Sequence, residues 1–191
     1  MPVARLLALV FAIFACCANQ VAESRSLWTV DPAKTRITFV IDAIGLLRTT
    51  GQFTNFQGKI AIDLDNPQAS NVTFKVAADS IDTGSSALNG FLRGEPFFDV
   101  ANYPYISFAS TRVEKADARH ANVTGNLTML GVTKPISLGV EVDRKLAGAG
   151  QRVGVKATGT IDRRDFGMDS GYPVISEAVH LTVTTEVAGE P

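Results

Sequence analysis

The sequence predicts an all-β protein in which about eight antiparallel strands close into a barrel, with one short helical insertion. Three observations favour this fold class. Apolar and polar residues alternate with a period of two along most of the chain. Turn-forming stretches such as LDNPQ and KLAGAGQ separate the alternating segments. One aromatic-rich segment, residues 83–100, interrupts the alternation.

The predicted strands place their apolar residues on one face. In residues 36–42, for example, Ile37, Phe39 and Ile41 alternate with polar side chains. An antiparallel sheet of this kind has one dry face and one wet face, and closure into a barrel removes its exposed edges. About eight strands leave room for one small ligand, or the interior fills with side chains. The same alternation covers residues 52–63, 71–78, 105–113, 123–129, 135–142, 152–161 and 179–187.

The segment of residues 83–100 predicts a short helix followed by aromatic residues. Leu88, Phe91 and Leu92 have helical spacing, and Phe97 and Phe98 come soon after. The segment is either a plug that caps one barrel end or a mobile lid over an apolar cavity. Clustered aromatic residues usually bury themselves, which favours the plug. We expect the segment to form part of the cavity wall or mouth.

The first 18 residues have the layout of a secretory signal peptide. Arg5 precedes an unbroken apolar run, and small residues follow it. The run is too short to span a membrane, which takes about 20 residues. We therefore expect cleavage near Ala18, export, and a single mature domain over residues 19–191. Lipid anchoring through Cys16 or Cys17 is the alternative, although the bulky Phe14 fits a lipoprotein signal poorly.

Few residues suggest catalysis, a metal site or a nucleic-acid partner. The formal net charge is -1, with no basic stripe. The two histidines, His120 and His180, are far apart in the sequence, and no G-x-S-x-G motif is present. Both cysteines lie within the expected signal, so the mature chain has none. We expect no catalytic residue, no metal ligand, no cofactor and no nucleic-acid partner.

The stretch GTIDRRDFGMDSG, residues 159–171, concentrates charge around one bend. Arg163, Arg164 and Asp165 precede Gly167, whose position indicates a sharp turn of the backbone. We predict a structural corner where a strand leaves the barrel, with Arg164 and Asp165 contributing to folding through a partly buried pair. The alternative is an arginine that meets the head group of a ligand.

Five sequence blocks together resemble the YceI-like family of polyisoprenoid-binding, periplasmic lipid-binding proteins. They occur in family order between residue 28 and about residue 187: WTVDPAKTRITFVI, GQFTNFQGKIAID, FLRGEPFFDVANYPYISFAST, GNLTMLGVTKPISL and IDRRDFGMD. The resemblance implies an extended lipocalin-like barrel with an apolar interior, a long isoprenoid ligand and a periplasmic location. Many relatives carry an Arg-Asp pair and a His before the Leu-Arg of the helical segment. Here Asn89-Gly90-Phe91 stand there, which predicts a more apolar entrance.

Three classes of function remain open: a carrier of an apolar ligand, an enzyme acting on such a lipid, and a structural or stress-response barrel with a filled core. The carrier is favoured, with a polyprenyl chain, a quinone or a quinone precursor in the cavity. Inward glycines such as Gly125, Gly139 and Gly159 would leave room for it. A homodimer could form through exposed strands or loops, but no residue marks one. The expected ligand contacts are Phe39, Phe91, Leu92, Phe97, Phe98, Phe108, Leu127, Met129, Phe166, Met168 and Val183.

Overall fold

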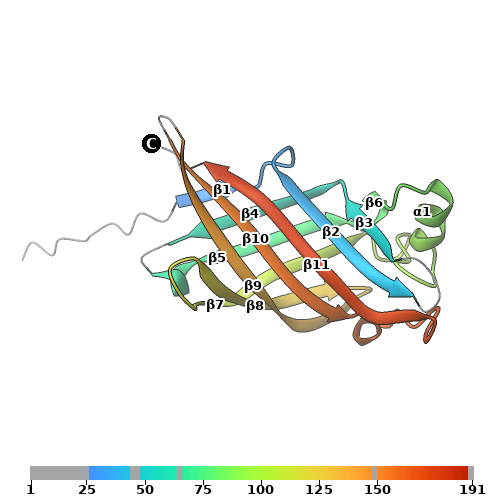
Figure 1. Ribbon diagram of the computed structural model, residues 1–191. Coiled ribbons are helices and arrows are strands. Elements are labelled where there is room, and N and C mark those ends of the chain that lie inside the picture. The colour runs from blue at the N-terminus through green and yellow to red at the C-terminus, as the bar shows by residue number, and fades with distance from the viewer. Residues whose placement is uncertain (1–25, 44–47, 64–65, 148–149, 189–191) are drawn as a thin grey trace, which may run out of the picture.

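The strands curl into one elongated antiparallel barrel, as the alternation predicts (Figure 1). The computed structural model describes residues 26–43, 48–63, 66–147 and 150–188, so the expected signal peptide, with Cys16 and Cys17, lies outside the described residues. The strands are β1 Ser26–Thr29, β2 Thr35–Ala43, β3 Thr49–Phe53, β4 Phe56–Ile62, β5 Asn71–Ala77, β6 Ile81–Asp82, β7 Tyr105–Lys115, β8 His120–Met129, β9 Val132–Ala147, β10 Gly150–Asp162 and β11 Ile175–Ala188. The helices are α1 Ser86–Arg93 and the 3-10 turns η1 Pro67–Ala69, η2 Ala78–Ser80 and η3 Arg163–Phe166.

The sheet closes through two long strands, each of which consists of two shorter strands in sequence. The hydrogen-bonded order is β1-β4-β5-β7-β8-β9-β10-β11-β2-β3-β6. β3 continues into β4 through Thr54 and Asn55, and β5 continues into β6 through η2. Across this junction Thr54 N–H donates to the Ser80 carbonyl at 3.1 Å, and Ala77 N–H donates to the Asn55 carbonyl at 3.0 Å. The β3–β4 strand therefore runs beside the β5–β6 strand. Because β4 stands near one end of the hydrogen-bonded order and β3 near the other, this strand closes the sheet into a barrel.

Within the described ranges, the barrel thus has the expected eight strands when each broken pair is taken as one: β2, β3–β4, β5–β6 and the five strands from β7 to β11. β1 is an addition that pairs with β4 alone. The side chains of the long strands also turn to the predicted faces of the sheet, apolar inward and polar outward. In β8, Val123, Leu127 and Met129 are buried while Asn122 and Asn126 are exposed. Period-two patterning therefore determined which face of each strand turns inward.

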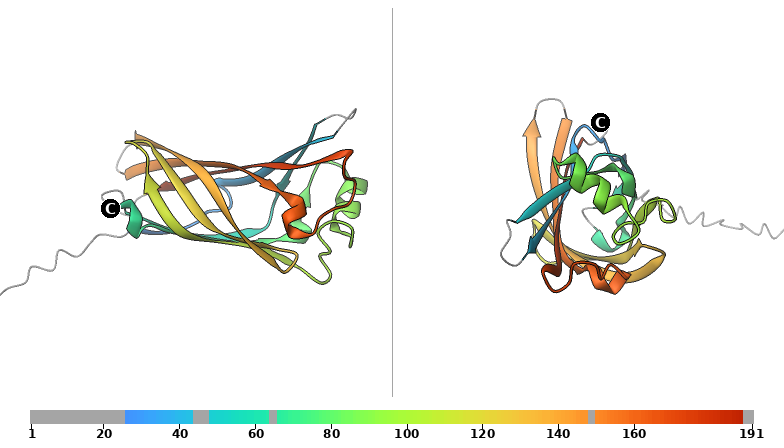
Figure 2. Two further views of the ribbon diagram at one scale, coloured as in Figure 1. Left: turned by 90° about the horizontal axis from the view of Figure 1, so that it is seen from below. Right: turned by 90° about the vertical axis from the view of Figure 1, so that its right-hand side faces the viewer.

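The two ends of the barrel differ in structure (Figure 2). At one end, called here the helical end, lie α1, η2 and η3. At the other end, called here the hairpin end, lie η1, the β7–β8 turn and the C-terminal end of β11. Two clusters of buried apolar residues fill much of the interior, one centred on β7 and β8 and the other on β2 to β6. Leu92 and Phe98 pack against both clusters from the helical end.

Candidate functional site

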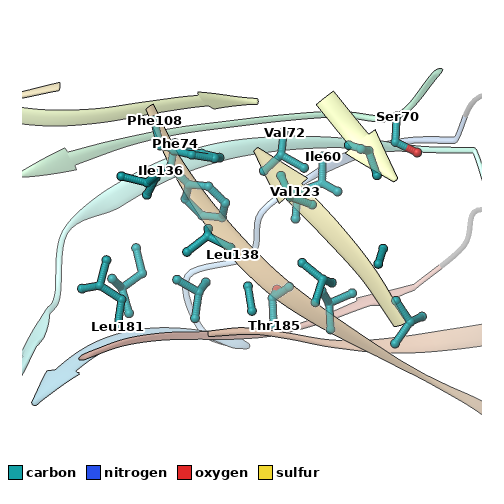
Figure 3. Close-up of a pocket in the computed structure, with 18 of the residues that line it drawn as sticks. Ile60, Ser70, Val72, Phe74, Phe108, Val123, Ile136, Leu138, Leu181 and Thr185 are labelled. Carbon is teal, nitrogen blue, oxygen red and sulfur yellow. The ribbon is translucent and has the colours of Figure 1, made fainter. Parts of the chain in front are cut away.

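An apolar cavity of about 240 Å³ lies inside the barrel. Its wall reaches from Met129 and Ile161, near the helical end, to the exposed β7–β8 turn, so the cavity meets solvent at the hairpin end. A cavity of roughly 150 Å³ with such a lining already admits a benzene ring. The wall residues point into the shared space in Figure 3, and they include Ile60, Val72, Phe74, Val123, Ile136 and Leu138.

The predicted contact residues fall into three groups. Phe108, Leu127, Met129 and Val183 line the cavity. Another four are buried in the core outside the cavity lining: Phe39, Phe97, Phe166 and Met168. The remaining three, Leu92, Phe98 and Phe91, belong to the helical end, and the side chain of Phe91 is 56% exposed. The placement of Phe91 on the cavity wall is therefore wrong, because its ring lies on the outer surface of α1.

Sequence reasoning missed the parts of the wall that come from β5 and β9. Val72 and Phe74 on β5 and Ile136 and Leu138 on β9 are only partly buried, because their side chains border the cavity. Both strands were recognised from their alternation, so the same signal could have placed these residues inside. Most of the predicted contacts are aromatic residues instead, and those mostly complete the core.

The inward-facing glycines do not leave the room expected of them. A Cβ atom built on Gly125 would lie 2.4 Å from the ring of Phe108, and one on Gly159 would lie 2.5 Å from Leu138. Large neighbours therefore already occupy the space over both residues. Gly139 is exposed and lies between inward-facing neighbours in the sequence, so it faces outward. Gly125 and Gly159 therefore make room for Phe108 and Leu138, and not directly for a ligand.

The helical end is a plug, and it is not the mouth of the cavity. Phe98 packs edge-on against Phe53 with ring centroids 5.7 Å apart, and Phe97 is 4% exposed. Arg93 ties the helix to the barrel by donating to the carbonyls of Asp79 at 2.7 Å and Ile81 at 3.2 Å. The expectation of a cavity wall or apolar entrance here is corrected, because the aromatic residues pack together and close this end.

Asn89 helps to fasten the plug. Its side-chain oxygen accepts from the backbone N–H and the hydroxyl of Thr83, at 2.8 and 2.7 Å. Its amide donates to Asp82 at 3.3 Å. The hydrogen bonds that Gly84, Asn89 and Gln52 make to Asp82 hold the pKa of this carboxyl below its ordinary value, with the Gly84 backbone bond first among them. Asn89 is thus a structural residue of the α1–β6 junction.

The polar part of the cavity wall lies at the hairpin end. Lys115, Asp117, Arg119 and His120 come from the β7–β8 turn and the two strand ends beside it, while Asp63, Ser70 and Thr185 come from neighbouring strands and turns. Ser70 and Thr185 belong to the wall drawn in Figure 3, and the Ser70 hydroxyl accepts from the Asp63 N–H at 3.0 Å. Thr185 shares a buried 2.7 Å hydrogen bond with Thr35. The cavity therefore offers an apolar interior and a polar, solvent-facing mouth.

The corner after β10 depends on a buried arginine. Arg163 is 1% exposed and donates to the carbonyls of Ser176 at 2.9 Å, Ile175 at 3.0 Å and Met168. Burial lowers the pKa of this guanidinium from its ordinary value, although arginine remains charged in proteins. Gly167 ends η3 in the left-handed conformation at φ 85°. The predicted structural corner is present, and Arg163 is its centre.

The expected Arg164–Asp165 pair does not form. Arg164 instead pairs with Asp169 at 3.0 Å, and both side chains are exposed. Its guanidinium also lies 4.1 Å from the centre of the Tyr172 ring. The error was to assign the buried role to Arg164, because two adjacent arginines cannot be told apart from local sequence. The 3-10 turn directs Arg163 inward and Arg164 outward.

Within the described ranges, no group of three or more His, Cys, Asp or Glu residues is arranged to hold a metal ion. A membrane-crossing helix is likewise not found among those residues, since none is both long and apolar enough.

The fold and the cavity define the class of protein: a lipocalin-like antiparallel barrel with an apolar interior. The chain belongs to the YceI-like domain family, whose pattern matches residues 28–187. A UPF0312 protein of Enterobacter sp. (strain 638) is 35% identical over 156 residues, covering 78% of this chain and 79% of that relative. Protein YceI of Salmonella arizonae is 33% identical over 156 residues, which again cover 78% of this chain and 79% of that relative.

Solved structures share the fold. BcnA of Burkholderia cenocepacia has a TM-score of 0.75 and 24% identity, and covers 83% of this chain and 99% of its own. The Campylobacter jejuni YceI protein has a TM-score of 0.71 and 23% identity, over 79% of this chain and 91% of its own. A polyisoprenoid binding domain from Saccharophagus degradans has a TM-score of 0.65 and 20% identity, and the match covers 87% of this chain and 99% of that domain. The lipocalin-like barrel predicted from the sequence is confirmed.

Proposed function

We propose that this protein binds one long apolar lipid of the isoprenoid type in its barrel cavity, and carries or sequesters it without chemical turnover. The ligand classes are a polyprenyl chain, a quinone or a quinone precursor. One observation carries the proposal: the inner part of the cavity wall is mainly aliphatic and aromatic, and the charged residues of the wall lie at the mouth. Each methylene buried there contributes about 0.8 kcal/mol to binding, so few polar contacts are needed.

The comparisons support the ligand class. The Saccharophagus degradans domain that shares this fold is described as polyisoprenoid binding. Binding rather than catalysis is also supported by where the charges lie. The charged residues of the wall belong to the hairpin end, while the inner wall among the described residues presents aliphatic and aromatic groups. An enzyme acting on the buried chain would place its titratable groups deeper, beside the reacting atoms.

The direct test is to extract native protein with organic solvent and identify the bound lipid by mass spectrometry. The apo protein is then titrated with prenylated quinones of several chain lengths. We expect a co-purifying isoprenoid lipid at about one per chain, and affinity that rises with chain length. An empty extract together with no binding of any quinone would contradict the proposal and favour a barrel with a filled core.

The location is proposed on the N-terminal sequence alone. We propose that residues 1–18 are removed on export and that the domain acts in the periplasm, where it needs no metal or cofactor. Intact-mass measurement of native protein should give a chain that begins near Asn19. A retained Met1, or an acyl group on Cys16 or Cys17, would replace this proposal with membrane anchoring.

A further inference from the structure

Lys115 occupies an inward-facing position at the mouth of the cavity. It is the last residue of β7 and follows Val113 by two positions, and both residues line the cavity. The intervening Glu114 faces outward and pairs with Arg112 at 2.7 Å. Lysine at an inward position of a barrel strand is unexpected beside aliphatic groups, unless its ammonium meets water or an anion.

Arg119 adds a second cation at the same mouth, on a turn that is held in place. The Asp117 carboxylate accepts from the backbone N–H groups of Arg119 at 2.8 Å and His120 at 2.9 Å. The Arg119 carbonyl accepts from Val142 N–H on β9 at 2.8 Å. The backbone of Arg119 is therefore fixed on both sides, and the residue is exposed and lines the cavity.

The two carboxylates of the mouth are engaged elsewhere. Asp117 also pairs with the imidazole of His120 at 2.8 Å, and its hydrogen bonds to the backbone of Arg119 and to His120 hold its pKa below the ordinary value. Asp63 belongs to the turn after β4, where it accepts from Asn66 N–H at 2.7 Å. Within the described part of the chain, neither Lys115 nor Arg119 forms an ion pair with these or any other acids.

We propose that the ligand carries an anionic head group, which Lys115 and Arg119 bind at the hairpin end while the apolar tail runs towards the helical plug. This inference rests on the proposed function and adds the chemistry and direction of the ligand. Phosphate and carboxylate both suit two cations, since charge-assisted hydrogen bonds to such anions are the strong ones. Thr185 lies on the same wall, and its hydroxyl is held by the 2.7 Å hydrogen bond that it shares with Thr35.

The test compares geranylgeranyl phosphate with geranylgeranyl alcohol, which share one chain and differ only at the head, and adds a fatty acid of similar length as a second anionic lipid. Wild-type protein should bind the phosphate about tenfold or more tightly than the alcohol, a difference equal to about 1.4 kcal/mol. The difference should shrink as salt concentration rises. Whether the fatty acid follows the phosphate or the alcohol distinguishes general anion binding from phosphate recognition.

Two variants and a matched control assign the effect to the mouth. Lys115→Met and Arg119→Met each keep the apolar stem and remove the charge, so each should reduce the ratio of phosphate affinity to alcohol affinity. Lys156→Met, on an exposed outward position of β10, should retain the full preference. Equal binding of phosphate and alcohol by the wild type would overturn this inference and leave the proposed function standing. Failure of all three lipids to bind would overturn both.

Discussion

At the scale of single residues, Arg163 is the side chain on which the corner after β10 depends. Three backbone carbonyls accept hydrogen bonds from its buried guanidinium. Arg163→Met keeps most of the volume and removes every donor. Each buried carbonyl left without a partner costs about 1–3 kcal/mol, so we expect the free energy of unfolding to fall by several kcal/mol. Urea unfolding followed by circular dichroism measures the change.

Arg164→Met is the control for that prediction. Its pair with Asp169 is exposed on both sides, and exposed ion pairs contribute about 0–1 kcal/mol. Unfolding energies that change equally in the two variants would show that the corner does not depend on the buried guanidinium. The same pair of variants tests the rejected alternative, in which one of these arginines meets the head group. Both should bind lipid as the wild type does while folded.

At the scale of elements, the buried aromatic residues beyond α1 should contribute more to the plug than Phe91 on the outer surface of the helix. Phe97 is 4% exposed and Phe91 is 56% exposed, although their rings are in contact, tilted by 59° with centroids 4.9 Å apart. Phe97→Ala should destabilise the protein by about 3–5 kcal/mol, as loss of a core aromatic does. Phe91→Ala should cost about 1 kcal/mol or less, mostly the lost ring contact. Thermal unfolding of both variants provides the comparison, and equal losses would contradict this account of the plug.

The junction between β6 and α1 should respond to acid. Hydrogen bonds from Gly84, Asn89 and Gln52 lower the pKa of Asp82 in the folded protein. A lowered folded pKa means that Asp82 stabilises the fold above its unfolded pKa of about 3.9, and that this contribution is lost as pH falls through the folded pKa. The Gly84 amide resonance should therefore shift in that acidic range. Asp82→Asn keeps an acceptor without the titration, so its Gly84 resonance should not follow the same transition.

At the scale of the whole molecule, the barrel positions an apolar space between a closed end and a polar end. Leu127 is 7% exposed and lines the cavity from β8. Leu127→Trp should fill part of the space, so that the longest prenyl chain accepted becomes shorter and affinity for long chains falls. Overpacking can also cost about 1–3 kcal/mol of stability, which melting temperatures would show. Titration with prenylated quinones of graded length measures the effect on binding.

Asn126→Trp is the matched control, because Asn126 is the next residue towards the N-terminus and faces solvent. It should leave the accepted chain length unchanged. If Leu127→Trp stays folded and binds the same chains as the wild type, the ligand does not pass Leu127. The binding path would then have to be sought elsewhere in the molecule.

Alternation within each strand was readable from the sequence, because a side chain's face depends only on its own position along the strand. It placed Phe108, Leu127, Met129 and Val183 on the inner face, and the structure adds that these four border the cavity. Burial and cavity lining are different properties. Phe39 faces inward just as correctly, yet its ring covers Gly51 and belongs to the packed core.

The sequence by itself therefore determined the fold class, the strand faces, the helical insertion and the presence of a structural corner, because each follows from local spacing and turn chemistry. Only the tertiary structure decided which end of the barrel opens, which of two adjacent arginines is buried, and where the cavity runs. Those features depend on residues brought together from distant strands. Lys115 and Thr185 share one mouth although 69 residues separate them, and barrel closure, rather than any motif, places them there.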